Sequence, residues 1–344
     1  MLLQIIGFSS RKSFIKFFIK HFKTDSYTQS QILTGYWSFF ITFATTFKNT
    51  MKISDILAGK KTLSFEIFPP KREEDTFTLI EKTIKQMDTY SPDFISVTYG
   101  ALGNTLSNTA SIARHIKENT KSEPLAHFTC VASDYSKVDS VCTELKNYGV
   151  ENILTLRGDM PKDVTTPVFS DFKHSSQMAQ YIAGRFPGDF CMAGACYPEK
   201  HPESENMRKE IEYMKIKQDA GMSFFNSQLF FDNEVFYHFL LQARKAGVTA
   251  PIIPGIMPVS NYAQLDRMIQ ITGCNVPLKL RNYFDRYKDD KAALEEIGII
   301  FTSYQILDLM ANDVDGIHIY SMNKSSFIAK LMDNIGYVAT EFFK

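Results

Sequence analysis

Several polar residues of this chain stand where short apolar runs end, at points where strands of a sheet would present side chains to a loop. The first is Glu66, in the run Ser64-Phe65-Glu66-Ile67-Phe68-Pro69-Pro70-Lys71. Strand alternation places Glu66 opposite Phe65 and Ile67, and the two prolines cannot extend a hydrogen-bonded ladder. A carboxyl at such a strand end could give a proton to a substrate, or it could be a solvated rim residue.

A second chemical cluster is the run Leu156-Arg157-Gly158-Asp159. Its glycine lets the backbone approach a ligand closely, the arginine suits a phosphate, and the aspartate suits a cationic centre. Taken singly, such residues have structural explanations: a histidine can be a satisfied core residue, and a glutamine a hydrogen-bonded rim amide. Polar residues nevertheless recur at nearly every expected strand end, namely Glu66, Thr98, His127 with Thr129, Arg157 with Asp159, Tyr197, Gln228, and Asn261 after the seventh strand.

Eight β-branched or aromatic runs alternate with longer helical patterns from Met51 onward, which indicates repeated βα units and a parallel sheet. The predicted strands are Thr62–Phe68, Asp93–Tyr99, Leu125–Val131, Asn152–Arg157, Asp189–Tyr197, Ser223–Phe231, Ala250–Ile256 and Val314–Tyr320. The predicted helices include Thr76–Tyr90, Thr109–Asn119, Ser136–Tyr148, Ser175–Arg185, Glu205–Ala220, Asn233–Ala246, Tyr262–Thr272 and Ala292–Asn312. Eight such units predict an α/β fold, a single-domain (β/α)₈ TIM barrel over residues 51–344, whose strand ends converge on one face. The sequence contains no GxGxxG after the first strand and no GxxxxGK[ST], so the usual Rossmann and P-loop arguments do not apply.

Composition narrows the class of protein further. The 344 residues carry 38 basic and 38 acidic side chains, which argues against nucleic acid as a partner. The five cysteines include no CxxC pair, so we expect reduced, buried thiols in a cytoplasmic protein with no metal site.

The first fifty residues differ from the rest. They hold six basic residues and one acidic residue, which leaves 32 basic and 37 acidic residues from Met51 onward. The aromatic run at 36–47 is shorter than the roughly 20 residues that cross a bilayer, so no membrane span is expected. We expect residues 1–50 to be a disordered or mis-started extension, although its basic and aromatic residues could also form an amphipathic helix on a membrane surface.

Nine stretches of the chain carry a resemblance to one family. They are SFEIFPPK (64–71), ISVTYGA (95–101), AHFTC (126–130), LRGD (156–159), CYPEKHPE (196–203), KQDAG (217–221), SQLFFD (227–232), IIPGIMPVSN (252–261) and IHIYSMNK (317–324). Their identity and order resemble methylenetetrahydrofolate reductase of the small bacterial type, an FAD-dependent (β/α)₈ barrel. The first fifty residues match nothing in that family.

The resemblance implies an activity. It implies that NADH or NADPH passes a hydride to non-covalent FAD, and that 5,10-methylenetetrahydrofolate then takes the same site and is reduced to 5-methyltetrahydrofolate for methionine synthesis. It assigns to Glu66 the proton that opens the folate ring at N10. For that role, burial among Phe65, Ile67 and Phe68 would have to raise the pKa of Glu66. Asp159 would stay ionised and stabilise the cationic iminium of the folate.

The resemblance also implies binding residues. For the flavin they are Thr98, Ala101, His127, Arg157, Gly158, Asp159, Ser175, Tyr197, His201, Ser204, Glu210 and Lys217. For the folate they are Asp159, Gln228, Gln264, Met268 and Lys324. The chain departs from the bacterial pattern at Tyr213 and Ile216, where asparagine and arginine are usual, and at Met222, so FAD would be held more loosely.

Two other functions remain open from the residues alone. A flavin-free barrel lyase would need a Schiff-base lysine, for which Lys279 is the nearest candidate, in a loop-like stretch. A pterin-binding or folate-binding barrel without reductase activity would have no use for Glu66. Relatives in the family are often homo-oligomers, and the same is expected here.

Overall fold

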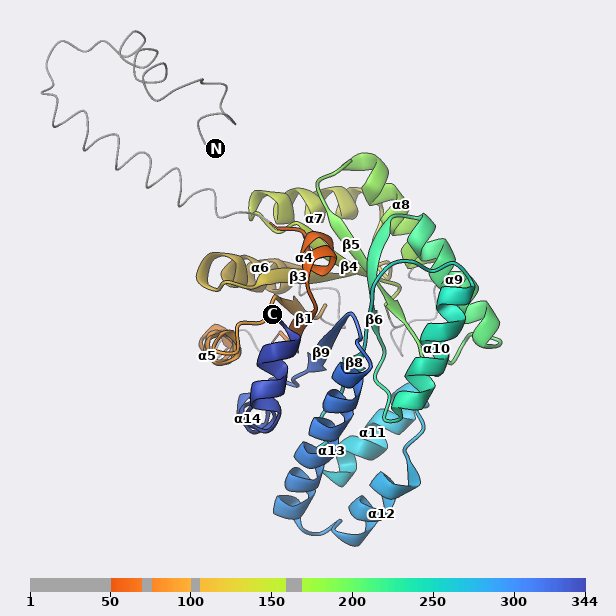
Figure 1. Ribbon diagram of the computed structural model, residues 1–344. Helices are drawn as coiled ribbons and strands as arrows, with labels where there is room; N and C mark the ends of the chain where they lie inside the picture. Colours follow the sequence, from red (N-terminus) through yellow and green to blue (C-terminus); the bar gives the residue numbers. More distant parts are fainter. Residues whose placement is uncertain (1–50, 70–75, 100–105, 159–168) are drawn as a thin grey trace, which may run out of the picture. The chain divides into compact units, whose positions relative to one another are not determined.

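The computed structural model describes residues 51–69, 76–99, 106–158 and 169–344. The predicted N-terminal extension therefore lies outside the described residues, and so do Ala101 and Asp159. Within the described ranges the chain runs through alternating helices and strands (Figure 1).

The strands form one parallel sheet. They are β1 (Thr62–Ile67), β2 (Phe94–Val97), β3 (Glu123–Thr129), β4 (Asn152–Leu156), β5 (Cys191–Cys196), β6 (Met222–Ser227), β7 (Ile252–Ile253), β8 (Gly255–Ile256) and β9 (Gly316–Tyr320). The hydrogen-bonded order in this part of the chain is β7-β6-β5-β4-β3-β2-β1-β9-β8. Successive strands are thus neighbours, as a (β/α)₈ barrel requires.

The barrel closes through Pro254, which divides the predicted strand Ala250–Ile256 into two. Its first half pairs with β6 through Phe225 and Ile252, and its second half pairs with β9 through Gly255 and His318. A proline cannot donate to the ladder, but the Pro254 carbonyl accepts a hydrogen bond from the amide of His318 at 3.0 Å. The single strand expected over 250–256 was therefore wrong, and β7 and β8 together occupy one position in the ring.

Helices surround the strands (Figure 1). They are α5 (Thr76–Asp88), α6 (Leu106–Asn119), α7 (Tyr135–Asn147), α8 (Ser175–Arg185), α9 (Met207–Asp219), α10 (Asn233–Lys245), α11 (Tyr262–Thr272), α12 (Leu278–Arg286), α13 (Lys291–Ala311) and α14 (Ser325–Phe342), preceded by α4 (Ile53–Gly59). The sequence prediction did not include α4, α12 or α14. Asn261, expected at the rim of the site, instead caps α11: its side chain accepts a hydrogen bond from the amide of Gln264 at 2.8 Å.

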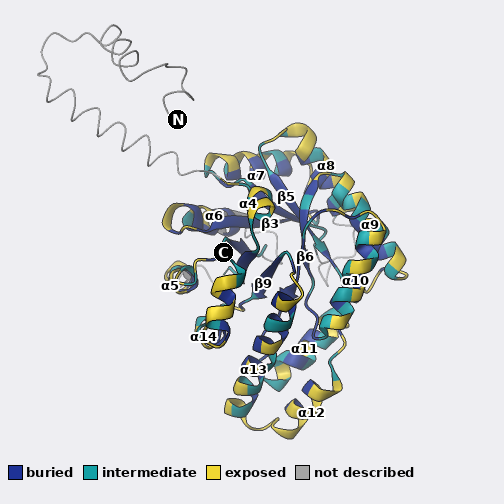
Figure 2. Cartoon of the chain, in the orientation of Figure 1, coloured by how far each residue is buried: buried dark blue, intermediate teal, exposed yellow. Residues whose placement is uncertain are grey.

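The strands consist largely of buried residues (Figure 2), and their apolar side chains fall into separate clusters. Phe65 and Ile67 of β1 belong to the main cluster between strands and helices. A separate cluster contains Ile53 with Phe94 and Phe224, so α4 packs onto the barrel strands. The amide of Ile53 donates to Oδ1 of Asn152 at 2.8 Å, which fixes α4 at the start of β4. None of the helices in the described ranges is both long enough and apolar enough to cross a membrane.

Candidate active site

Glu66 lies on the face of β1 opposite Phe65 and Ile67 and is almost fully buried, with 6% of its surface exposed. Its neighbours come from three strands. Ser96 on β2 donates its hydroxyl to Oε2 at 3.3 Å. The Nε2 atoms of His127 on β3 and His318 on β9 lie 3.4 and 3.7 Å from the same oxygen. The environment of the carboxyl is therefore polar.

This environment corrects the expectation that the pKa of Glu66 is raised. Burial does raise the pKa, but the contact with His318 and the interactions with His127 and Ser96 outweigh it, so the pKa lies below its ordinary value. The expectation failed because Phe65 and Ile67 pack on the other face of the strand and do not surround the carboxyl.

The two histidines differ in how they are held. Nδ1 of His318 lies 2.8 Å from the hydroxyl of Ser64, which orients the ring. Burial lowers the pKa of His127 to about 4, so its imidazole is neutral at pH 7. Among the described residues, Nε2 of each ring is buried without a hydrogen-bond partner, and both atoms face the Glu66 carboxylate. Unpaired buried polar atoms are costly and mark a place where a ligand or water can bind.

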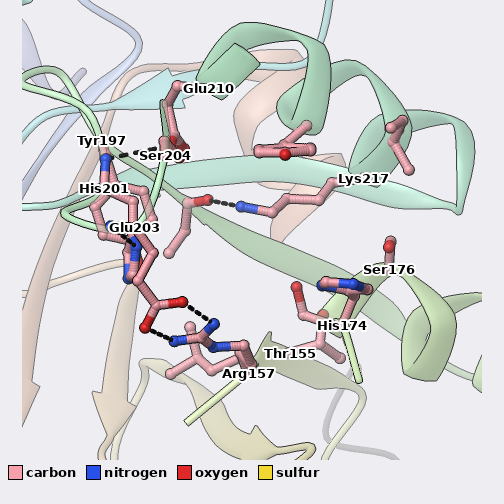
Figure 3. Close-up of a pocket in the computed structure, with 15 residues that line it drawn as sticks. Thr155, Arg157, His174, Ser176, Tyr197, His201, Glu203, Ser204, Glu210 and Lys217 are labelled. Carbon is pink, nitrogen blue, oxygen red and sulfur yellow. Dashed lines mark hydrogen bonds and ion pairs between the residues drawn. The ribbon is translucent and has the colours of Figure 1, made fainter. Parts of the chain in front are cut away.

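A cavity of about 370 Å³ lies beside the ends of β4 and β5 (Figure 3). Seven of the twelve predicted flavin-binding residues line it: Arg157, Ser175, Tyr197, His201, Ser204, Glu210 and Lys217. Figure 3 shows His174 and Ser176 on the opposite side of this cavity from His201 and Ser204. The structure thus brings together residues that lie far apart in the sequence.

Hydrogen bonds hold the polar wall of this cavity. Glu210 accepts from the Ser204 hydroxyl at 2.6 Å and from the His201 amide at 3.2 Å. Lys217 donates to the Ala195 carbonyl at 2.7 Å, with its ammonium 5.7 Å from the centre of the Tyr197 ring. Burial lowers the pKa of both Lys217 and His201.

Gly158 follows β4 with φ at +84°, a conformation that favours glycine. A Cβ atom there would lie 2.9 Å from Cβ of Thr129, so the backbone packs too closely for any side chain. The adjoining Arg157 pairs with both carboxylate oxygens of Glu203, at 2.5 and 2.7 Å. The glycine of the LRGD run thus carries the turn that places this arginine at the cavity.

A second cavity, of about 310 Å³, is lined by Gln228 and by the loop after β5. Gln228 turns its Oε1 back to the amide of Leu229 at 2.9 Å. Gln264 and Lys324 meet at Ser260. Gln264 accepts a hydrogen bond from the Ser260 hydroxyl at 3.2 Å, and Lys324 donates one to the same hydroxyl at 2.7 Å. Gln264 and Lys324, both predicted to bind folate, are therefore brought together.

Three other predicted residues lie outside the linings of these two cavities. Met268 is 8% exposed in an apolar cluster with Leu229 and Leu265, and lines neither of the two cavities. The carbonyl of Thr98 accepts from the Thr109 hydroxyl at 3.1 Å. Lys279 is exposed on α12, in a helix and not in the expected loop.

The chemistry of the first cavity fits a phosphate-bearing dinucleotide. Arg157, His201 and Lys217 supply charged or polar N–H donors, and the Ser204 hydroxyl lies beside them. Tyr213 and Ile216 add exposed apolar surface to the same wall. Nε2 of His127, buried without a hydrogen bond, faces the Glu66 carboxylate at 3.4 Å.

Sequence reasoning missed three residues that the structure places in or beside the site. They are His318 and Ser96 beside Glu66, and Glu203 paired with Arg157. His318 had a usable signal, because it is a polar residue between Ile317 and Ile319 on the last predicted strand and therefore alternates to the other face from them. Glu203 had none, since its partner comes from a different loop.

Together, the parallel strand order, the buried Glu66 carboxylate and the cavity at the ends of β4 and β5 define the class: a (β/α)₈ barrel with its candidate site among the strand ends. Residues 52–336 match the family model described as methylenetetrahydrofolate reductase. The chain therefore belongs to the methylenetetrahydrofolate reductase family.

Known relatives agree with this assignment. The chain is 30% identical over 278 residues to 5,10-methylenetetrahydrofolate reductase of Escherichia coli (strain K12), covering 81% of this chain and 92% of that one. It is 31% identical over 291 residues to methylenetetrahydrofolate reductase (NADH) 1 of Zea mays, covering 81% of this chain and 49% of that protein. The chain thus spans about half the length of such plant relatives.

A solved structure shares the fold. It is described as an uncharacterized protein from Clostridium thermocellum that binds two copies of 5-methyl-5,6,7,8-tetrahydrofolic acid, with a TM-score of 0.57 and 13% sequence identity over 83% of this chain and 99% of that one. At that identity the likeness concerns the barrel alone.

Proposed function

We propose that this protein reduces 5,10-methylenetetrahydrofolate to 5-methyltetrahydrofolate with electrons from NADH or NADPH, in alternating half-reactions at one site. The observation that carries the proposal is the position of Glu66, buried and surrounded by polar groups in a member of this family. The cavity lined by seven predicted flavin-binding residues supports non-covalent FAD as the cofactor. FAD, when bound, would supply the hydride acceptor and donor that links the two substrates.

The residues of the first cavity would hold the cofactor by its charges. Arg157 and Lys217 would contact the phosphate groups, and His201 would donate a hydrogen bond from its neutral ring. Gly158 would hold the turn that brings Arg157 to the cofactor, because its positive φ and the Thr129 side chain packed against it leave no room for a Cβ atom. Ser204 and Glu210 would fix the loop that carries His201.

Glu66 would deliver a proton to N10 of the folate, so that the methylene bridge opens to the iminium. In the ligand-free protein its pKa lies below the ordinary value, so it must take up a proton in the complex. Because Glu66 is already almost fully buried, a bound folate would raise its pKa by weakening the interactions with His318, His127 and Ser96 that lower it. His127 cannot compete for that proton at neutral pH, because burial keeps its own pKa at about 4.

Asp159, which lies outside the described residues, is proposed to stabilise the iminium. Gln228 lines the second cavity and is proposed to bind the pterin. Lys324 and Gln264, joined through Ser260, are proposed to contact the glutamyl part of the folate. The proposed setting is the cytoplasm, to which the five buried free cysteines are suited.

The visible spectrum of the purified full chain tests this proposal. Flavin absorbance, or its perturbation when FAD is added to the apo-protein, is expected. A chain that neither retains nor binds FAD would favour the folate-binding barrel without reductase activity, or the lyase for which Lys279 was the candidate.

A further inference from the structure

The Arg157–Glu203 ion pair lies at the edge of the first cavity (Figure 3). Both guanidinium NH groups contact the carboxylate, at 2.5 and 2.7 Å, in the two-pronged arrangement that arginine also forms with phosphate. The pair is accessible: the side chains are 32% and 64% exposed. Glu203 therefore occupies the face of Arg157 that an incoming phosphate would need.

The same pair also separates two spaces. Arg157, Tyr197, His201 and Glu203 line the cavity of about 370 Å³ and also the cavity of about 310 Å³ that contains Gln228. These four residues thus form a partition between the space proposed for the cofactor and the space proposed for the folate.

We propose that the Glu203 carboxylate is a displaceable counter-anion, which neutralises Arg157 in the ligand-free protein and leaves it when the phosphates of a dinucleotide bind. The proposal rests on the proposed function, because it takes FAD as the ligand of the first cavity. It adds a residue that sets the affinity of that cavity for anions and that opens the partition as the cofactor enters.

The local structure permits this exchange at small cost. The backbone amide of Glu203 stays tied to Nδ1 of His201 at 3.1 Å, so only the side chain has to turn. That side chain is already mostly in solvent, and exposed ion pairs contribute little stability. The pyrophosphate of a dinucleotide carries two negative charges against one on the carboxylate, and it would also be contacted by Lys217 and His201, so it wins the competition for Arg157.

The test is a titration of full-length apo-protein with FAD, followed by quenching of flavin fluorescence, for the wild type and Glu203→Gln. The variant keeps the size of the side chain but removes the charge that competes with phosphate. Its Kd for FAD is expected to fall about two- to fivefold, in keeping with the weakness of an exposed pair. Glu212→Gln is the matched control: it removes a carboxylate from an exposed ion pair with Lys209 on α9 that lines neither cavity, and it should leave the Kd unchanged.

A second titration, by calorimetry with inorganic pyrophosphate, separates this proposal from the proposed function. If Glu203→Gln binds pyrophosphate more tightly than the wild type does, the counter-anion role of Glu203 is supported. This holds even if the wild type binds no FAD, a result that would overturn only the flavin function. The opposite result overturns the proposal. If the wild type binds FAD, and Glu203→Gln binds both FAD and pyrophosphate no more tightly than the wild type does, Glu203 does not compete with the phosphates for Arg157.

Discussion

Nε2 of His127 lies 3.4 Å from Oε2 of Glu66, although the two residues stand on β3 and β1 with β2 between them. This arrangement is possible because inward-facing side chains of alternate barrel strands meet in one layer. It gives Glu66 a polar environment and a lowered pKa. Glu66 must therefore become protonated when the folate binds if it is to donate a proton. The interior histidines, and not the apolar residues of β1, then control when Glu66 holds a proton.

Replacing Glu66 with glutamine should separate the two half-reactions. Glu66→Gln keeps the shape of the side chain but cannot donate a proton from a carboxyl, so folate reduction should fall by about 10²-fold or more. Oxidation of NADH and the bound-flavin spectrum should stay near wild type. Stopped-flow absorbance measures both rates separately.

Glu295→Gln on α13 is the control, because it removes a carboxylate that pairs with Lys330 far from the barrel interior. Folate reduction by Glu66→Gln at the rate of this control would remove Glu66 from its proposed role.

The buried neutral His127 should make stability depend on pH. Its folded pKa of about 4 lies below the ordinary value of about 6.5, so the unfolded chain takes up the proton first as the pH falls. The folded state therefore loses about 2 kcal/mol from this group between pH 7 and pH 5, and the loss continues down to about pH 4. Glu66, with a lowered pKa, adds a loss in the same direction at still lower pH.

Urea unfolding at pH 7 and pH 5 measures this loss. In His127→Asn the difference in unfolding free energy between the two pH values should shrink by about 2 kcal/mol. His238→Asn, a change at an exposed position of α10, should keep the wild-type difference. An unchanged pH dependence in His127→Asn would show that this histidine is not buried in its neutral form.

A cation at position 216 should tighten the flavin site. Ile216 is 52% exposed in the wall of the first cavity, one turn from Tyr213. Ile216→Arg removes exposed apolar surface and adds a phosphate-binding group, so the Kd for FAD should fall severalfold. Fluorescence titration measures the Kd for FAD of this variant and of the control Ile300→Arg on α13. Ile300 is 57% exposed and does not line the cavity. Equal affinities for the two variants would mean that residue 216 does not reach the cofactor.

Helix α4 should contribute strongly to stability even though it has only seven residues. Ile53 is fully buried among side chains of the barrel strands, so Ile53→Ala should lower the unfolding free energy by about 2–5 kcal/mol. The same truncation at the exposed Ile300 should cost far less. Denaturant unfolding of both variants checks this, and equal small losses would show that α4 does not pack on the barrel.

The barrel could be predicted from the sequence because strand-like and helix-like segments alternate regularly along it. The residues at the rim could be predicted because they stand where those strands end. The pKa of Glu66 could not, because the neighbours that set it, His127 and His318, are distant in sequence. The short helix α4 could not be predicted either, because its single buried residue gives no periodic pattern of apolar residues. The pairing of Arg157 with Glu203 depends on how two loops meet, which no local pattern encodes.

Anaerobic reduction of the purified protein, followed by addition of 5,10-methylenetetrahydrofolate, tests the central claim most directly. NADH should bleach the visible absorbance of the flavin. The folate should then restore that absorbance with formation of 5-methyltetrahydrofolate. A flavin that NADH reduces but that stays reduced after the folate is added would contradict the account.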